Sequence, residues 1–320
     1  MSDLIEQYRT LCVQEPTIPL FSQAWWLDAT AGPGNWDVAL VQKGDEILAS
    51  LPYAILKRRG FTFLSQPALT QTLGPWLRES SGKPAKRLAQ EKDLMEALID
   101  QLPPFDRYAQ NWSWKVKNWL PFYWRGYSQT LRYTYALPDL SNLESIWKDV
   151  QANIRTDVRK AENRFQLRVR DDLPLEDFIQ LNKLTFGRQK MALPYSEEYV
   201  NRLDEACKKR KSRKILIAED SQGRQHAGIY IVWDKNSAYY LLGGGDPELR
   251  NSGATSLCMW EAIKFSATVT QRFDFEGSMM EPVERFFRAF GAIQTPYFSV
   301  HKTPSRILRT INFLRELKAK

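Results

Sequence analysis

Two kinds of apolar pattern divide this chain into alternating β-rich and helical stretches. In the first half, two β-rich runs over residues 38–56 are joined by Lys43-Gly44-Asp45, which predicts a hairpin. Helical patterns and further strand patterns flank this hairpin. The other predicted elements of this half are helices at 3–12 and 85–101 and strands at 61–64, 105–110 and 131–137. We therefore expect an α+β arrangement for the first half.

A domain boundary is predicted close to residues 140–150. Pro138, Asp139 and Ser141 stand there before a helical pattern over 143–163, and a proline with a capping residue is typical of a helix start. Beyond it, short turns separate three consecutive strands, which predicts an antiparallel meander. The predicted elements are strand 166–170, helices 174–189 and 196–210, strands 213–220, 225–234 and 237–244, helix 252–267, strand 272–277, helix 281–290 and strand 297–301.

Length and composition agree with two folded domains. The chain has 320 residues, which exceeds the usual length of a single domain, with 43% hydrophobic and 26% charged residues. This balance excludes a disordered chain, because enough apolar surface is present to build packed cores. We expect domains at 1–145 and 146–302, followed by a C-terminal helix at 303–320.

The cysteine and histidine content excludes two classes of site. Cys12, Cys207 and Cys258 are an odd number at wide separation, and His226 and His301 are the only histidines. A disulfide framework or a zinc site needs more of these residues at closer spacing, so we expect neither, and no metal. The sequence also holds no apolar run of membrane-spanning length. We therefore expect a cytoplasmic protein.

Basic residues are concentrated in the second half. Residues 1–148 carry 16 basic and 15 acidic side chains, whereas residues 149–320 carry 29 and 22. The phosphates of a cofactor, a nucleotide-linked substrate, tRNA or a membrane surface would all match this excess, and so would solvated surface charge. Tryptophans are distributed the opposite way, with nine of the eleven before residue 149. They suit an aromatic core, or stacking on sugars or nucleobases.

The most specific motif of the chain begins at the third strand of the meander. Residues 238–266 read AYYLLGGGDPELRNSGATSLCMWEAIKFS, and RFDFEGS follows at 272–278. These residues and the element order of the second half resemble the GNAT acyltransferase superfamily in its Fem-like (FemAB-type) branch. PLFSQAWW at 19–26 is similar to the opening of such proteins. The resemblance implies two tandem GNAT-like domains, the first degenerate, each a mixed and mostly antiparallel sheet flanked by helices.

Residues 250–255 approximate the GNAT pattern R-x-x-G-x-G/A, which binds the pyrophosphate of coenzyme A. Thr255 departs from it at the last position. Small residues suit this role because backbone N–H groups at a helix start must approach phosphate oxygens closely. The resemblance implies acyl-CoA, such as acetyl-CoA, as donor, or aminoacyl-tRNA as in Fem-type enzymes; an ordinary glycine turn with a helix cap is the alternative. The predicted donor-binding residues are Gly243, Gly244, Gly245, Arg250, Asn251, Ser252, Gly253, Ala254 and Thr255.

Two acids and a tyrosine are the predicted catalytic residues. Asp274 and Glu276 alternate with phenylalanines, so a regular strand would point both carboxylates to one face. Two acids on one face can raise each other's pKa, and we favour Glu276 as the general base. Tyr240, or its neighbour Tyr239, is a candidate general acid. Alternatively, one of the acids pairs with Arg272 or caps the next helix, and the tyrosines pack in the core.

Three further residues are predicted to bind the acceptor. Arg188 and Gln189 end a predicted helix at the place where the acceptor loop of a GNAT fold lies, and Arg159 belongs to a basic helix start that resembles Fem-like proteins. An arginine offers a forked donor to carboxylate or phosphate. The alternatives are an arginine that binds the free carbonyls of its own helix end and a solvated helix face.

The C-terminal segment predicts a basic amphipathic helix. Apolar residues recur there at helical spacing, with basic residues between them. The apolar positions are Ile307, Leu308, Ile311, Leu314 and Leu317, and the basic ones are Arg309, Arg315 and Lys318. Such a helix docks on its own domain or touches a membrane surface.

Together these features predict an N-acyltransferase in which an acceptor amine attacks the donor carbonyl directly. The acceptor is expected to be a small molecule or a cell-envelope precursor. One alternative is a Fem-type enzyme that uses aminoacyl-tRNA, and another is a non-catalytic binding protein that keeps the fold. The oligomeric state does not follow from these patterns.

Overall fold

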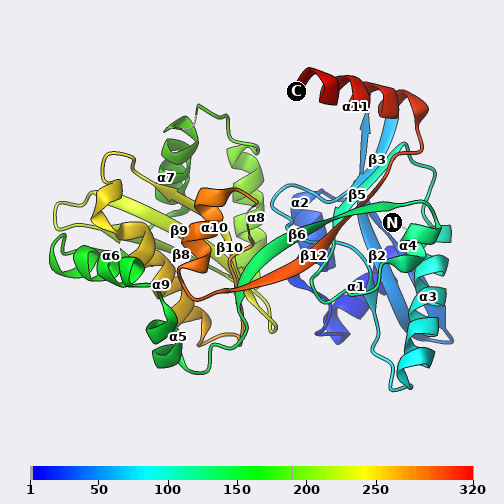
Figure 1. Cartoon of the computed structure of the whole chain (residues 1–320), viewed down its shortest axis with the longest axis horizontal. Coiled ribbons are helices and arrows are strands. Elements are labelled where there is room, and N and C mark those ends of the chain that lie inside the picture. Colours follow the sequence, from blue (N-terminus) through cyan, green and yellow to red (C-terminus); the bar gives the residue numbers. More distant parts are fainter. Residues whose placement is uncertain (1–2, 189, 278, 320) are drawn as a thin grey trace. The chain divides into compact units, whose positions relative to one another are not determined.

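The chain folds into two compact units. The computed structural model describes residues 3–188, 190–277 and 279–319. Unit 1 comprises Met1–Arg132 and Pro296–Lys320, and unit 2 comprises Tyr133–Thr295 (Figure 1). These limits differ from the predicted boundaries at 145 and 302, because strands β6 (Ser128–Leu137) and β12 (Ile293–Lys302) each begin in one unit and end in the other.

Unit 1 contains a mixed sheet with the strand order β1-β2-β3-β5-β12, and β4 pairs with β2. Its strands are β1 (Trp36–Lys43), β2 (Glu46–Arg58), β3 (Phe61–Ser65), β4 (Trp76–Leu77) and β5 (Arg107–Asn111). Its helices are α1 (Asp3–Gln14), η1 (Leu20–Ser22), α2 (Ala24–Thr30), α3 (Pro84–Asp100), α4 (Leu120–Trp124) and α11 (Arg306–Ala319). The predicted hairpin is confirmed as β1 and β2, and Gly44 in its turn has a φ of 62°, which favours glycine. The short elements α2, α4 and β4 have no predicted counterpart.

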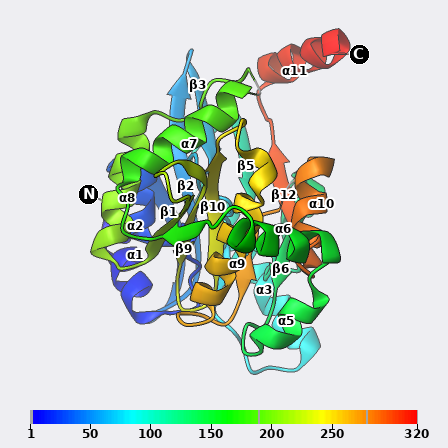
Figure 2. The same cartoon turned by 90° about the vertical axis from the view of Figure 1, so that its left-hand side faces the viewer.

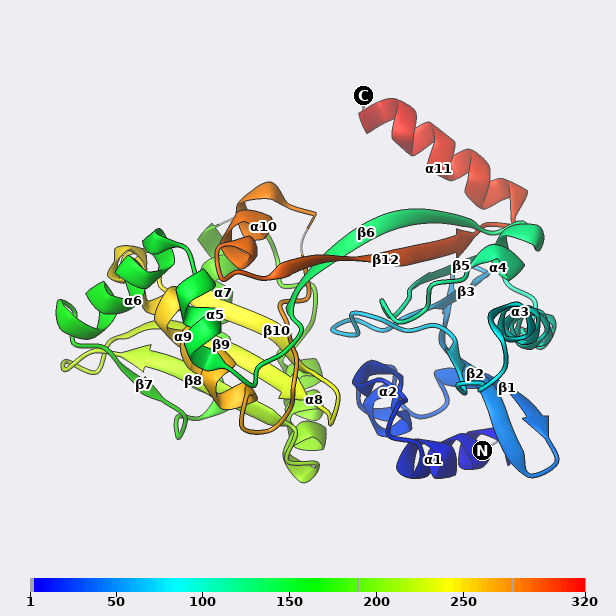
Figure 3. The ribbon, with the colours of Figure 1, turned by 60° about the horizontal axis from the view of Figure 1, so that its bottom comes forward.

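The sheet of unit 1 is covered on both faces, because successive side chains of β1 point to opposite faces and both sets include buried residues. Trp36, Val38 and Leu40 pack with α1 and α2, whereas Ala39 packs with α3 in a second core (Figure 3). Trp112 belongs to the core with α3, and Trp26 is fully buried against Phe21 and Trp25. Aromatic packing thus accounts for much of the tryptophan content.

The strands of unit 2 pair in the order β6-β11-β10-β9-β8-β7, antiparallel except for the parallel pair β10 and β11. Its further strands are β7 (Arg168–Arg170), β8 (Arg213–Glu219), β9 (Gln225–Trp233), β10 (Ala238–Gly245) and β11 (Phe273–Asp274). Its helices are α5 (Leu143–Asp149), α6 (Ala152–Asn163), α7 (Leu175–Arg188), α8 (Glu197–Lys209), η2 (Arg250–Ser252), α9 (Ala254–Ser266) and α10 (Glu281–Arg288). The predicted antiparallel meander is confirmed as β8, β9 and β10.

The prediction of a single helix over residues 143–163 is wrong. The chain forms α5 and α6 instead, and buried Val150 between them is extended with ψ 131°. The next residue, Gln151, donates its N–H to the carbonyl of Ala289 at 2.8 Å. The Gln151 N–H therefore forms a tertiary hydrogen bond in place of one within a helix. The periodicity of the sequence alone does not reveal this bond.

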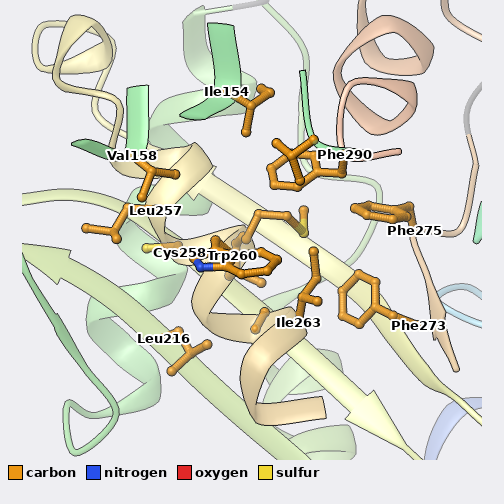
Figure 4. Close-up of a cluster of buried hydrophobic side chains, with 14 of the residues drawn as sticks. Ile154, Val158, Leu216, Leu257, Cys258, Trp260, Ile263, Phe273, Phe275 and Phe290 are labelled. Atoms are coloured by element: carbon orange, nitrogen blue, oxygen red, sulfur yellow. The ribbon is translucent and has the colours of Figure 1, made fainter. Parts of the chain in front are cut away.

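Helices cover both faces of the sheet in unit 2. On one face α9 lies across the strands and α6 packs on α9 (Figure 2). The core on this face joins Ile154 and Val158 of α6 to Leu257 and Ile263 of α9 and to Phe273 of β11 (Figure 4). On the other face, α7 contacts β9 and β10, and α8 contacts β8. The fold is a mixed, mostly antiparallel sheet flanked by helices, as predicted.

The last helix, α11, exposes apolar side chains. Ile307, Phe313, Leu314 and Leu317 are each more than half exposed. Across the described part of the chain, no helix is long and apolar enough to cross a membrane.

Candidate active site

A β-α-β crossover creates the candidate site in unit 2. Strands β10 and β11 run parallel and share only two register pairs, Ala238 with Phe273 and Tyr239 with Asp274. Strand β11 then ends, whereas β10 continues to Gly245 beside β9. Helix α9 connects the two strands, so its N-terminus lies toward the carboxyl end of β10. Ligands of open α/β sheets bind at such carboxyl ends.

The three consecutive glycines form the end of β10, which extends one residue beyond the predicted strand 237–244. Gly243, Gly244 and Gly245 pair with residues 227–229 of β9. A Cβ at position 244 would overlap the α7 backbone at Leu181 and Asn182, because the helix packs directly on this strand. The glycines therefore allow a helix to approach β10 closely, a role that the strand pattern alone does not reveal.

Two polar side chains of α7 hold this glycine segment, and sequence reasoning missed both. Asn182 donates from Nδ2 to the carbonyl of Gly243 at 2.7 Å, and Gly245 donates its N–H to Oγ1 of Thr185 at 3.0 Å. Tyr195 in turn donates its hydroxyl to Oδ1 of Asn182 at 3.0 Å. The available signal was an asparagine on the buried, otherwise apolar face of α7. Such a buried polar residue needs partners, and it finds them in the backbone of β10.

Tyr240 lies directly over the glycine segment. The register of β10 and β9 shifts between Tyr240 and Leu242, and such a bulge re-aims side chains. The ring packs edge-on against Phe287 at 5.8 Å, and a side chain at position 243 would collide with the Tyr240 hydroxyl. Burial is the main cause that raises the pKa of Tyr240 to about 12, and the nearby Tyr195 adds to the increase. The phenol is therefore protonated at neutral pH and able to donate a proton.

The fingerprint segment 250–255 divides into a buried and an exposed part. Ser252, Gly253 and Ala254 are buried, and a Cβ at position 253 would overlap the carbonyl oxygen of Asp157 on α6. Gly253 also has a φ of 82°, so packing and backbone conformation both require glycine there. Arg250, Asn251 and Thr255 are exposed at the start of α9. Donor binding by this segment remains a prediction.

The carboxylates do not have the predicted arrangement. Strand β11 ends at Asp274, and Glu276 has a φ of 56°, so the regular strand that would align both acids is absent at this point. Asp274 is buried and accepts from Arg272 Nη2 at 2.9 Å, from the Glu276 N–H at 2.9 Å and from the Thr134 hydroxyl. The pairing with Arg272 corresponds to the structural alternative stated for these acids. Asp274 therefore anchors the backbone of Glu276.

Tyr239 lies close to both acids. It is the register partner of Asp274, and burial raises its pKa well above the usual value, with Asp234, Asp274 and Glu276 adding to the shift. The carboxylate oxygens of Glu276 are themselves buried. The two neighbouring tyrosines thus have different surroundings, Tyr239 near the acids and Tyr240 over the glycines.

The predicted acceptor residues do not come together. Arg188 is exposed at the last position of α7, about one helical turn beyond Thr185, which contacts Gly245. Gln189 lies outside the described residues. Arg159 is exposed on α6, which packs on α9 across the sheet from α7. Of the two described residues, Arg188 lies near the glycine segment and Arg159 lies on the other side of the sheet.

No metal centre accompanies this site in the described residues, where no group of three or more His, Cys, Asp or Glu side chains could hold an ion. The free cysteines Cys207 and Cys258 are buried, and Cys12 is half-buried.

The family follows from comparison with known sequences. The model of the acetyltransferase (GNAT) domain matches residues 148–314, which is more than half of the chain. The chain belongs to the GNAT acetyltransferase family. A comparison with curated proteins finds no match to this GNAT protein.

Solved structures show that its two-unit fold is Fem-like. The structure of FemX has a TM-score of 0.68 at 12% identity and covers 93% of this chain and 96% of its own. L-PGS from Bacillus licheniformis has a TM-score of 0.56 at 12% identity, covering 98% and 96%. A tandem GNAT protein from the clavulanic acid biosynthesis pathway has a TM-score of 0.53 at 11% identity, covering 93% and 94%. At these identities the likeness concerns the fold.

The contact between α7 and β10 predicts opposite effects for the same substitution at two glycines. Gly244→Ala should destabilise the protein by about 1–3 kcal/mol, because a methyl group overlaps the α7 backbone. Gly187→Ala, within α7 and with open space around it, should be neutral or stabilising by up to about 1 kcal/mol. Urea unfolding followed by circular dichroism measures both. Equal stability of the two variants would contradict the close contact at Gly244.

Proposed function

We propose that this GNAT protein transfers an acyl group from acyl-CoA to an amine by direct attack. The observation that carries the proposal is the crossover of β10, α9 and β11, which directs the start of α9 and the Tyr240 hydroxyl toward the same strand end. The positive end of a helix dipole and exposed polar residues suit a phosphate group. The family membership supports acyl transfer as the class of reaction.

The donor would be held at the start of α9. Arg250, Asn251 and Thr255 are exposed there, whereas the smaller residues between them are buried against α6. The pyrophosphate would therefore meet the exposed side chains and the first free N–H groups of the helix. The glycine strand end, held by Asn182, would lie along the acyl arm.

The chemical step would need one base and one acid. The acceptor nitrogen attacks the acyl carbonyl carbon, the C–N bond forms and the C–S bond breaks. The amine proton passes to the Glu276 carboxylate, and the Tyr240 hydroxyl gives its proton to the departing thiolate. Both groups then regain their protonation states by exchange with solvent. Asp274 would act as a positioning residue, because it accepts the Glu276 N–H at 2.9 Å.

The second candidate is a Fem-type transferase that uses aminoacyl-tRNA. The likeness to FemX extends over both units, and the second half carries the excess of basic residues that a polyanion would need. The third candidate is a binding protein that keeps the fold without turnover, supported by the departure at Thr255. The acceptor would be a small molecule or a cell-envelope precursor, bound with Arg188, Gln189 and Arg159 as predicted contacts. The free cysteines suit a cytoplasmic location.

Binding of the donor should depend on charge at the start of α9. Thr255→Glu places a carboxylate beside the proposed pyrophosphate and should weaken acetyl-CoA binding by about tenfold or more. An acid in the first helical turn suits the helix dipole, so the variant should fold normally. Calorimetric titration with acetyl-CoA, longer acyl-CoAs and an aminoacyl-tRNA pool at two salt concentrations measures the effect.

The matched control is Thr268→Glu, which adds the same charge at an exposed site beyond the other end of α9. It should bind acetyl-CoA like the unmodified protein. Binding of tRNA alone would favour the Fem-type candidate. Binding of neither donor would favour the non-catalytic one.

Loss of the Tyr240 hydroxyl should affect turnover more than binding. Tyr240→Phe keeps the ring against Phe287 but removes the proposed proton donor, so kcat should fall by about 100-fold with KM for the donor nearly unchanged. Thiol release from acetyl-CoA with a panel of primary amines measures the rate. A loss of kcat in Tyr239→Phe, with full activity in Tyr240→Phe, would assign the acid to the neighbouring tyrosine instead.

Membrane contact through α11 is a further part of the proposal. The exposed Phe313 and Leu317 would insert into the interface while Arg309 meets anionic headgroups. Phe313→Ser combined with Leu317→Ser should weaken binding to phosphatidylglycerol vesicles by about tenfold or more in co-sedimentation. Val13→Ser, which removes an exposed apolar side chain from α1, is the control. Equal binding to phosphatidylcholine and phosphatidylglycerol vesicles would argue against the role of the arginines.

A further inference from the structure

A cavity of ligand size lies entirely within unit 1. It has a volume of about 640 Å³ and is enclosed by α3, by the segment around β4 and by the loop after β5. Pockets of several hundred Å³ are typical of small-molecule sites. None of its lining residues belongs to the crossover of unit 2.

The floor of this cavity is apolar and held in place. Leu73, Trp76 and Met95 line it and are buried. Leu73 donates its N–H to the carbonyl of Asn111 at 2.7 Å, and Trp76 donates from Nε1 to Thr17 Oγ1 at 2.9 Å. These bonds connect the floor to β5 and to the segment after α1. The cavity is therefore part of the folded unit and would not have to form when a ligand binds.

The mouth of the cavity is cationic. Arg87 of α3 and Lys115 and Lys117 of the loop after β5 line it and are exposed. Among the described residues, these three side chains form no ion pair with a carboxylate. Arg78, by contrast, is committed to Glu15 at 2.9 Å and to Glu46 at 3.2 Å. Three cations without a carboxylate partner in the described part of the chain thus line the entrance from two different elements, and the Nζ of Lys117 lies 5.5 Å from the centroid of the Trp114 ring.

Two acids also line the cavity without cancelling this charge. Glu91 accepts a hydrogen bond from Nδ2 of Asn118 at 3.3 Å, which fixes it to the wall. Glu79 is exposed at the edge. With Arg78 neutralised by Glu15 and Glu46, three basic and two acidic side chains of the lining remain, and their summed charge is positive.

We propose that this cavity binds a phosphate-bearing small molecule whose apolar group reaches the floor. A phosphate ester carries more than one negative charge and three acceptor oxygens, which match cations that approach from two sides. When the ligand binds, its apolar part covers the floor formed by Leu73, Trp76 and Met95 and shields it from water. This site is separate from the proposed donor site, and it stands independently of the proposed reaction.

Geranyl phosphate is a suitable probe, with geraniol and inorganic phosphate as partial ligands. Calorimetric titration of the full chain should show saturable binding of geranyl phosphate that weakens as salt is raised. Geraniol and inorganic phosphate should each bind at least about tenfold more weakly, because each provides half of the recognition. Equal binding of geraniol and geranyl phosphate would overturn the cationic recognition, and no binding of geranyl phosphate would overturn the site.

Charge reversals locate the binding. Arg87→Glu and Lys117→Glu should each weaken geranyl phosphate binding by about tenfold, because each replaces a cation at the mouth by an anion. Lys86→Glu is the matched control: it makes the same change at the neighbouring exposed position of α3, which does not line the cavity, and should stay within about twofold of the unmodified protein. Equal weakening in all three variants would show non-specific attraction and overturn the site.

A filling variant tests the cavity itself. Leu88 lines the cavity and is 55% exposed, so Leu88→Trp should fold and obstruct the entrance. Geranyl phosphate binding should be lost, with the circular dichroism spectrum and the urea unfolding midpoint unchanged. A loss of folded structure would show that the variant damages the whole protein, and hydrogen exchange of residues 72–80 in the unmodified protein would then test the site. Protection of that segment by geranyl phosphate supports the site, and its absence contradicts it.

Discussion

The packing of α7 on the end of β10 is the contact on which the candidate active site depends. Gly244 has no side chain, and the helix backbone lies in the space that a Cβ would occupy. Asn182 and Thr185 then bond to the backbone of Gly243 and Gly245, so the strand end is held at three consecutive residues. Because α9 starts from the segment that follows, the same contact governs where the helix N-terminus lies relative to Tyr240.

A second contact fixes the start of α9 from the opposite side. Gly253 lies against the carbonyl of Asp157, so α6 and α9 approach each other as closely as α7 and β10 do. Glycines at both ends of the segment between β10 and α9 thus allow neighbouring backbones to pack closely. A phosphate site built here would use the exposed residues Arg250, Asn251 and Thr255 and the helix dipole, and would not require the buried small residues to face the ligand.

The sequence predicted the regular elements of unit 2 well, because strands β8 to β10 and helices α7 to α9 carry their own periodicity and caps. Ser196, for example, caps α8 by accepting the N–H of Tyr199. The errors arose where tertiary contacts decide the local structure. Val150 breaks a helical pattern because Gln151 bonds to Ala289, and β11 stops at Asp274 because that side chain bonds to the Glu276 N–H.

The glycine segment shows a different limit of sequence reasoning. The predicted strand 237–244 already includes two of the three successive glycines, but only the structure shows that α7 packs on them. The polar partners of the segment, Asn182 and Tyr195, are far from it in sequence. A buried asparagine in an apolar helix face signals that a partner exists, but the residues cannot say which one.

Unit 1 contains a crossover like that of the candidate site, but its strand ends are closed. Unit 1 has its own parallel pair, β3 and β5, connected through α3 and sharing two register pairs as β10 and β11 do. There, however, the Gln66 side chain accepts the Asn111 N–H at 2.6 Å and donates to Thr70, and Leu73 bonds to the Asn111 carbonyl. The chain itself thus occupies the strand ends that would receive a ligand. Unit 1 keeps the crossover without an open strand end, and its cavity has instead formed at α3, where cations and an apolar floor create a site of a different kind.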